Sequence, residues 1–267
     1  TGMLPDLAAV RDRSTGTRHK IFKFLSFGWT GAHEQWRHYT RGYLFFAALA
    51  TPLVISVHSV VSWDFALGVV PGWHTTIFAP YFVAGAIHSG LAMVITLMIP
   101  LRMIFGYQQI ITDHVLEAVA KTIVFTGLIV GFAYATEFFI AWYSHNPLEQ
   151  YIFAWRPTGD YAVGFWIMAI CNTIIPLLFL FKKVRTNIPA LFIISLIVNV
   201  GMWYERFVII ITSVARDFIP HNWGLFSPSI IEYGIMIGAF SLFFFLFCLF
   251  VKHMPAVSMT EVKEMLE

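Results

Sequence analysis

Long apolar segments alternate with short polar ones along this chain, as in proteins that cross a membrane several times. A helix needs about 20 mostly apolar residues to cross the roughly 30 Å hydrocarbon core of a bilayer. Six segments meet this requirement, at residues 41–63, 78–104, 118–143, 161–181, 188–214 and 230–251. The pattern predicts an all-α integral membrane protein whose six-helix transmembrane domain extends over residues 41–251.

Composition supports the same class. Apolar residues make up 58% of the chain and charged residues 12%, whereas soluble domains average about 45–50% and about 25%. So few charges cannot cover the surface of a water-soluble globule, and they also exclude a disordered chain and a nucleic-acid-binding protein. The expected partner of the outer surface is lipid, with no nucleic acid.

Lysine and arginine are distributed unevenly between the two sides of the predicted domain. Counted together with the span ends next to it, the side that holds residues 1–40, the loops after the second and fourth spans and residues 252–267 carries 14 of the 17 Lys and Arg residues. The opposite side, called side B below, carries 2, Arg156 and Arg216. Since cytoplasmic loops are enriched in Lys and Arg, both ends of the chain are predicted to be cytoplasmic. Side B is then extracytoplasmic.

Three loops on side B, at residues 63–74, 145–157 and 217–228, are rich in aromatic residues, proline and glycine. Tryptophan and tyrosine at this level are typical of the interfacial belt of membrane proteins. Three such loops on one face also suit a surface that docks against another subunit. The sequence leaves both interpretations open.

Ionisable residues inside the spans are costly and indicate function. Asp64 lies at the side-B boundary, and at 1.5 Å per residue His58 lies roughly 7 Å below it and Glu137 roughly 9 Å. Glu205 lies roughly 13 Å deep and His88 roughly 15 Å. The other half of the spans has hydroxyl side chains but no carboxylate or histidine. This asymmetry favours a redox site that exchanges protons with side B over a channel with relays in both halves.

Each of these groups also has a structural interpretation. A histidine in a membrane helix often serves as a hydrogen-bonded packing residue, and this applies to His58 and His88. Asp64 can serve as a cap at the end of the first span. Its position beside His58 and a tryptophan-rich loop favours a chemical role.

Glu205 and Arg206 are sequence neighbours, about 100° apart around a helix. They are therefore expected not to face each other, and each to find its partner on another helix, which favours a structural ion pair for Arg206. Glu137 has Tyr134 and Thr136 close to it in sequence and is open to either a structural or a functional role.

The chain is expected to bind no metal, haem or iron–sulfur cluster of its own. Cys171 and Cys248 are isolated, whereas clusters and structural zinc need grouped ligands. Ligation of a haem by two histidines needs imidazoles at similar depth. The two histidines within the spans, His58 and His88, differ by roughly 8 Å in depth.

Two parts of the sequence resemble a known family. Residues 2–8 (GMLPDLA) with Arg11 and Asp12 resemble the segment before the fifth helix in the polysulfide-reductase membrane-subunit (NrfD/PsrC-like) family. A closer resemblance, to the large NrfD-like subunits of bacterial alternative complex III, is carried by residues 56–66 (SVHSVVSWDFA), 71–78 (PGWHTTIF) and 80–86 (PYFVAGA).

This resemblance implies a protein of about ten helices in two four-helix bundles, of which this chain would be the last six. It also implies a location in the inner membrane of a bacterium and a quinol site near the periplasmic face. The implied quinol-binding residues are His58, Trp63, Asp64, Trp73 and His74. The implied proton-relay residues are His88, Glu137, Glu205 and Arg206.

The sequence therefore leads to a functional hypothesis, a membrane subunit that oxidises menaquinol or ubiquinol near side B. His58 and Asp64 are the catalytic bases expected to receive the quinol protons. The electrons need an acceptor, expected to be an iron–sulfur subunit accompanied by cytochrome c-type subunits and a paralogous NrfD-like subunit. A proton-conducting subunit without quinone chemistry and a structural paralogue are the alternatives.

Overall fold

The computed structural model describes residues 2–73, 75–255, 257–259 and 262. Within these ranges the regular secondary structure is helical and contains no strand. Six helical stretches in the described part are long and apolar enough to cross a membrane: α3 (His33–Ala66), α4 (Phe78–Phe105), α5 (Asp113–Tyr143), Ala162–Leu180, Ile188–Thr212 and α10 (Ile230–His253). The prediction of an all-α protein with six spans is confirmed, although α3 begins at His33 rather than at residue 41.

The chain forms two units, one of residues 1–53 with 227–267 and one of residues 54–226. In the first unit, α1 (Leu4–Asp12) and α2 (Gly16–Leu25) precede the amino-terminal part of α3. Arg11 of α1 donates to the carbonyl oxygen of Trp29 at 2.8 Å, and the Tyr39 hydroxyl donates to that of Gly2 at 2.9 Å.

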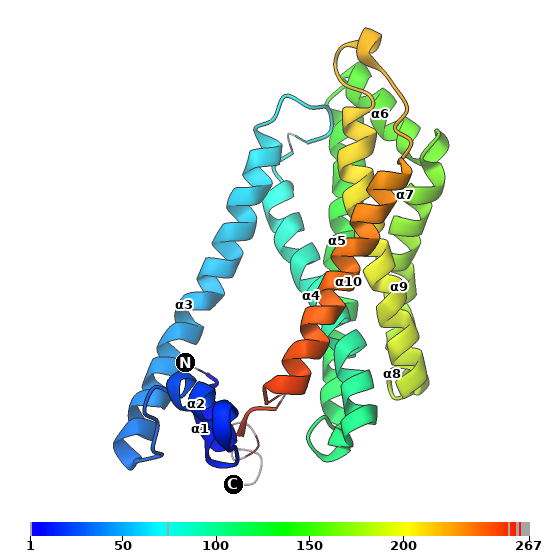
Figure 1. Ribbon diagram of the computed structural model, residues 1–267. Helices are drawn as coiled ribbons and strands as arrows, with labels where there is room; N and C mark the ends of the chain where they lie inside the picture. Colours follow the sequence, from blue (N-terminus) through cyan, green and yellow to red (C-terminus); the bar gives the residue numbers. More distant parts are fainter. Residues whose placement is uncertain (1, 74, 256, 260–261, 263–267) are drawn as a thin grey trace. The chain divides into compact units, whose positions relative to one another are not determined.

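The second unit is a bundle of four long helices (Figure 1). These are α4, α5, the helix that starts as α7 (Ala162–Ala169), and α9 (Ile188–Phe207). Short helices α6 (Pro147–Thr158) and α8 (Lys182–Arg185) lie at opposite ends of the bundle. The segment 145–157, predicted as a loop, is thus mostly helix α6, with Ile152 and Phe153 buried.

Polar side chains lie between two apolar clusters inside the bundle. One cluster includes Ile95, Ile123, Phe179 and Val198. The other includes Phe78, Val130, Phe165 and Val208. Between them, each long helix contributes a buried polar residue, namely His88 of α4, Thr126 of α5, Asn172 of the α7 helix and Glu205 of α9. These four residues are called the polar layer below.

Two of the long helices contain a wider π-helical turn beside the polar layer. The helix of α7 continues through the π turn η2 (Ile170–Ile174) into the 3-10 turn η3 (Ile175–Leu180), and α9 continues into the π turn η4 (Val208–Thr212). Pro176, at the start of η3, has no N–H to donate to the preceding turn, which accounts for the irregular hydrogen bonding there. Such π turns are common at functional sites.

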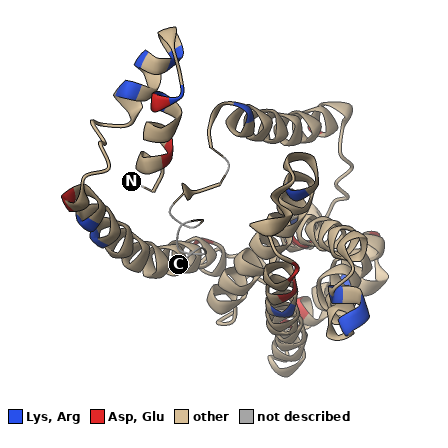
Figure 2. Ribbon diagram, turned by 90° about the horizontal axis from the view of Figure 1, so that it is seen from below, with Lys and Arg blue, Asp and Glu red and all other residues tan. Residues whose placement is uncertain are grey.

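Charged residues are sparse along the ribbon, most of which carries none (Figure 2). This agrees with the six apolar spans of the described residues. At the start of α10, Glu232 belongs to a capping box in which Ser229 and Glu232 satisfy each other's backbone N–H groups. Its position at a helix amino terminus is therefore explained by capping.

Candidate functional site

The carboxyl-terminal part of α3 carries three of the predicted quinol-site residues. His58 is half-buried, and its Nδ1 lies 2.8 Å from the carbonyl oxygen of Val54 one turn earlier. Asp64 is exposed, and Trp63 is 53% exposed. His58 and Asp64 are six residues apart, which places them about 120° from each other around the helix. They flank a common stretch of α3 without sharing a face.

The loop after α3 folds back onto the side-B end of the bundle. The indole N–H of Trp73 donates to the carbonyl oxygen of Ile209 at 2.8 Å, and its ring meets that of Phe65 edge-on at 4.9 Å. Gly72 has a φ of +80°, and a Cβ there would lie 3.0 Å from the Arg156 guanidinium. Only glycine fits this position without strain. Trp73 is thus fixed beside the end of α3, and His74 lies outside the described residues.

Glu205 is fully buried and connects three helices. Its Oε2 accepts a hydrogen bond from the Tyr134 hydroxyl at 2.5 Å. That hydroxyl in turn accepts from Asn172 Nδ2 at 2.9 Å. The Tyr134 ring meets Tyr81 of α4 edge-on, with centroids 5.7 Å apart. The prediction that Glu205 finds a partner on another helix is confirmed.

Arg206 does not behave as the sequence predicted. Its NH2 lies 3.8 Å from Oε1 of the adjacent Glu205, so the two side chains do meet. The long arginine side chain curls back far enough to overcome the 100° offset between neighbouring residues. Its guanidinium lies over the Phe82 ring of α4, 4.7 Å from the centroid, and the side chain remains 40% exposed. The expectation of two residues that face apart was wrong.

His88 is fully buried and bonded on one side only. Its Nδ1 lies 2.9 Å from the Thr126 hydroxyl oxygen. That hydroxyl also donates to the carbonyl oxygen of Thr122 at 3.0 Å. Nε2 is buried and has no hydrogen-bond partner among the described residues. His88 therefore presents an unpaired ring nitrogen to the interior of the bundle.

Glu137 forms a second polar group with Arg156, which the sequence placed in a side-B loop. Arg156 NH1 lies 3.9 Å from Glu137 Oε2, and the guanidinium also donates to the hydroxyls of Thr212 and Ser213 at 3.2 and 2.9 Å. Both members of the pair are buried. Burial lowers the pKa of Arg156, and the Glu137 carboxylate opposes that shift. The pair joins α5, α6 and the end of the π turn η4.

Five buried polar atoms in this region have no hydrogen-bond partner among the described residues: His88 Nε2, Asn172 Oδ1, Thr173 Oγ1, Glu205 Oε1 and Glu137 Oε1. Buried polar groups in folded proteins are nearly always satisfied, by protein or by ordered water. Polar atoms of this kind, here close to two π turns, are typical hydrogen-bond partners of internal water. The interior around the polar layer is therefore suited to hydration and to proton transfer.

The structure brings some of the predicted residues together and leaves others apart. Glu205 and Arg206 belong to one network. Arg206 lies over the Phe82 ring, and Phe82 contacts Phe65 near the end of α3, with ring centroids 5.6 Å apart. His88 and Glu137 each have their own partners. The roles assigned to these side chains remain predictions.

Three residues of the networks were not identified from the sequence. Tyr134 was noted only as a neighbour of Glu137, Asn172 was not considered, and Arg156 was counted as a loop cation. Asn172 stands in an apolar span. A search for all polar side chains within the spans, rather than for ionisable ones alone, would have identified it. Nothing in the local pattern of Arg156 indicates that it is buried.

No group of three or more His, Cys, Asp or Glu side chains in the described part of the chain is placed to hold a metal ion. The expectation that the chain has no redox centre of its own remains a prediction. A quinone needs no such group, because it binds through aromatic contacts and hydrogen bonds.

Two comparisons place the chain among known proteins. A family model described as "Polysulphide reductase, NrfD" matches residues 17–216. A protein of Halobacterium salinarum that is described as a putative membrane subunit of dimethyl sulfoxide reductase is 24% identical over 243 residues, which cover 80% of this chain and 54% of the relative. The chain thus spans about half the length of this relative.

Proposed function

Because the chain belongs to the NrfD family of polysulphide reductase membrane subunits, we propose that it binds and oxidises quinol near side B. Members of this family are integral membrane proteins, and the chain is a multi-pass protein of the inner membrane, with six apolar spans in its described residues. A membrane subunit of a reductase interacts with quinone through the lipid phase. We propose in addition that the quinone site lies near side B and that the reaction there is oxidation of quinol rather than reduction of quinone.

One arrangement carries this proposal, namely a partly exposed cation beside a buried and hydrogen-bonded carboxylate. Arg206 lies over Phe82 and next to Glu205. Phe82 contacts Phe65, the residue after Asp64, and Phe65 contacts Trp73. A quinol is a flat ring with two hydroxyl groups, and it needs aromatic walls with a few fixed polar groups. The contacts from Trp73 through Phe65 and Phe82 to Arg206 supply both aromatic rings and a fixed polar group.

Quinol oxidation yields quinone, two protons and two electrons. Asp64 is exposed and His58 half-buried, so each can pass a proton to water on side B once it has taken one from a quinol hydroxyl. Arg206 is suited to orient the ring oxygen and to stabilise negative charge that develops on it. The two electrons go to an iron–sulfur subunit docked on side B.

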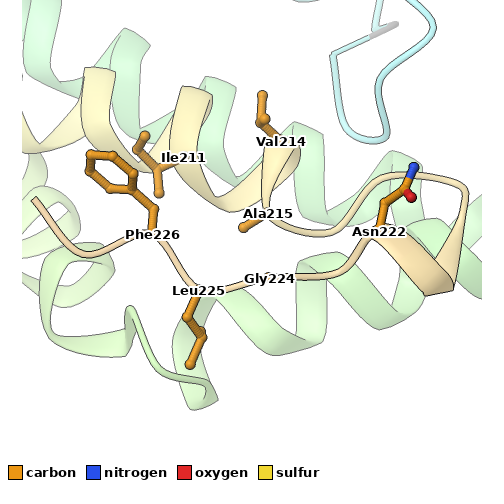
Figure 3. Close-up of a pocket in the computed structure, with 7 residues that line it drawn as sticks. All are labelled: Ile211, Val214, Ala215, Asn222, Gly224, Leu225 and Phe226. Atoms are coloured by element: carbon orange, nitrogen blue, oxygen red, sulfur yellow. The ribbon is translucent and has the colours of Figure 1, made fainter.

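The surface proposed for that subunit is the side-B end of the bundle, where aromatic and charged side chains contact one another. Arg216 pairs with Asp160 at 3.8 Å and lies over the Trp155 ring at 4.3 Å, while Trp223 stacks on Tyr151 at 5.1 Å. A cavity of about 310 Å³ at this end is lined by Ile211, Val214 and Ala215, in and after the π turn η4, and by residues of the segment 222–226 (Figure 3). These contacts favour a fixed docking surface. Cytochrome c-type subunits and a paralogous NrfD-like subunit, as in alternative complex III, complete the proposed assembly.

A proton-conducting role is the second candidate, and one observation favours it. The unpartnered polar atoms of the polar layer suit internal water. Farther from side B, Asn199 donates to the Thr96 hydroxyl at 3.0 Å, and the buried Ser195 hydroxyl has no partner in the described part of the chain. A water path through these groups is compatible with quinol chemistry at side B.

Photolabelling tests the proposed site directly. In the purified complex, a photoreactive quinone analogue should label this chain within residues 54–82, and an excess of unlabelled quinone should prevent the labelling. Labelling confined to other subunits would overturn the proposal and favour the structural alternative.

A further inference from the structure

A cavity lies at the opposite end of the bundle from Arg156 and the proposed quinol site. It has a volume of about 660 Å³ and is bounded by the carboxyl end of α4, the turn after it and the amino end of α9. Its walls are almost entirely apolar and include Met103, Ile104 and Phe192. Two polar side chains, Arg102 and Gln108, also face it. Cavities of this size in proteins hold small organic ligands.

Arg102 is the feature that gives the cavity a charge preference. Its side chain is only 12% exposed, and NH2 pairs with Asp113 at 2.7 Å. NH1 is buried, and no described residue accepts a hydrogen bond from it. The Asp113 side chain is 70% exposed, so water screens its carboxylate. The cavity is therefore lined by a cation whose carboxylate partner lies in water, with no buried anion to match it.

The surroundings add to this positive character. Ile188 and Pro189, at the first turn of α9, line the cavity. A helix amino terminus carries a partial positive charge. Arg102 lies three residues before the end of α4 at Phe105, or about 4.5 Å along the helix axis. That depth is close to the level of lipid phosphates at the predicted cytoplasmic boundary.

We propose that this cavity binds an anionic phospholipid, with an acyl chain along Met103, Ile104 and Phe192 and the phosphate at Arg102. Charge complementarity selects this occupant. An acyl chain or a quinone tail alone supplies no negative charge at Arg102, whereas a phosphate does. Basic pockets between membrane helices on the cytoplasmic side are a known means of lipid recognition.

The test compares two lipids with the same acyl chains on the delipidated, purified complex. Native mass spectrometry should show phosphatidylglycerol bound to this chain at least tenfold more tightly than phosphatidylcholine. Loss of one charge-assisted hydrogen bond weakens binding about 10- to 100-fold. Arg102→Gln should therefore lose that much affinity for phosphatidylglycerol and little for phosphatidylcholine. Equal binding of the two lipids to the unaltered complex would overturn the proposal.

A matched variant separates lipid binding from the structural role of the ion pair. Asp113→Asn breaks the same pair but keeps the Arg102 charge, so it should retain the preference for phosphatidylglycerol. Loss of the preference in both variants would show that the ion pair only supports the fold. Should Arg102→Gln not assemble, Ile104→Trp fills the cavity without touching the pair and should abolish the bound lipid. Unchanged lipid binding in that variant would contradict the proposal.

Discussion

Glu205 is a carboxylate with no exposed surface inside a membrane bundle. Transfer of an unpaired charge into such an environment costs several kcal/mol. Here the Tyr134 hydroxyl, the Asn172 amide and the Arg206 guanidinium surround it. Tyr134 and Asn172 come from other helices, and only Arg206 is a sequence neighbour. The buried carboxyl group is therefore stabilised only when the helices of the bundle are packed together. Glu205 is therefore a structural centre of the bundle, and its role in proton transfer remains a prediction.

The Tyr134 hydroxyl is the closest partner of Glu205, and its removal should be costly. Tyr134→Phe removes the shortest hydrogen bond to Oε2, whereas the Asn172 amide lies 3.5 Å from that oxygen. Leaving a buried acceptor short of its donor costs about 1–3 kcal/mol, so thermal unfolding in detergent should occur at a lower temperature. Tyr143→Phe is the matched control, because Tyr143 ends the same helix and is 70% exposed. If both variants unfold at the temperature of the unaltered protein, the hydroxyl does not support the network.

Close helix packing around the polar layer depends on small residues. Gly201 of α9 lies against the π turn η2, and a Cβ there would fall on the side chains of Asn172 and Cys171. Gly127 of α5 is similar, since a Cβ would lie 3.1 Å from His88 Cε1. The helices approach closely at the level where their polar side chains interact, and glycine permits that approach.

Two glycine-to-alanine variants should therefore change stability in opposite directions. Gly201→Ala forces a methyl group into the contact with η2 and should destabilise the bundle by about 1–3 kcal/mol. Gly90→Ala, in α4, meets open space and should stabilise its helix by about 0.5–1 kcal/mol. Unfolding temperatures of the two purified variants check this. A stabilising Gly201→Ala would contradict the packing at η2.

Apolar length was enough to predict the membrane helices, because crossing a bilayer imposes a requirement that each span meets by itself. The π turns at Ile170–Ile174 and Val208–Thr212 were not predicted, since they depend on how neighbouring helices pack. The depth of Glu205 could be predicted by counting residues along one span. Its contact with Tyr134 could not, because that contact also depends on how two helices pack. The burial of Arg156 depends on α6 folding onto the bundle end, and no local pattern reports that.

Buried titratable groups of the bundle lie at the polar layer and toward side B, while apolar clusters pack on both sides of that layer. The polar layer and the Glu137–Arg156 pair lie toward side B, and the cluster that contains Ile95, Ile123 and Val198 fills the other half. Proton exchange from a site at this level is shortest toward side B. This agrees with quinol oxidation that releases protons on the extracytoplasmic face.

The predicted orientation has its own test in intact cells. In a background with both native cysteines replaced by alanine, a membrane-impermeant thiol reagent should label Gln150→Cys, in α6 on side B. Lys183→Cys, in α8 at the other end of the bundle, should react only after the membrane is permeabilised. Labelling of Lys183→Cys but not Gln150→Cys in intact cells would reverse the orientation and move the proposed site to the cytoplasmic face.

Quinol oxidation by complexes with altered α3 residues tests the proposed function most directly. Asp64→Asn keeps the size of the side chain and removes its ability to accept a proton, and loss of a general base typically costs about 10²- to 10⁴-fold in rate. We expect turnover to fall at least tenfold in Asp64→Asn and in His58→Ala, with the complex still assembled. Glu34→Gln, which alters an exposed carboxylate at the other end of α3, should turn over at the unaltered rate. Wild-type turnover by assembled Asp64→Asn and His58→Ala complexes would contradict a quinol site at this end of α3.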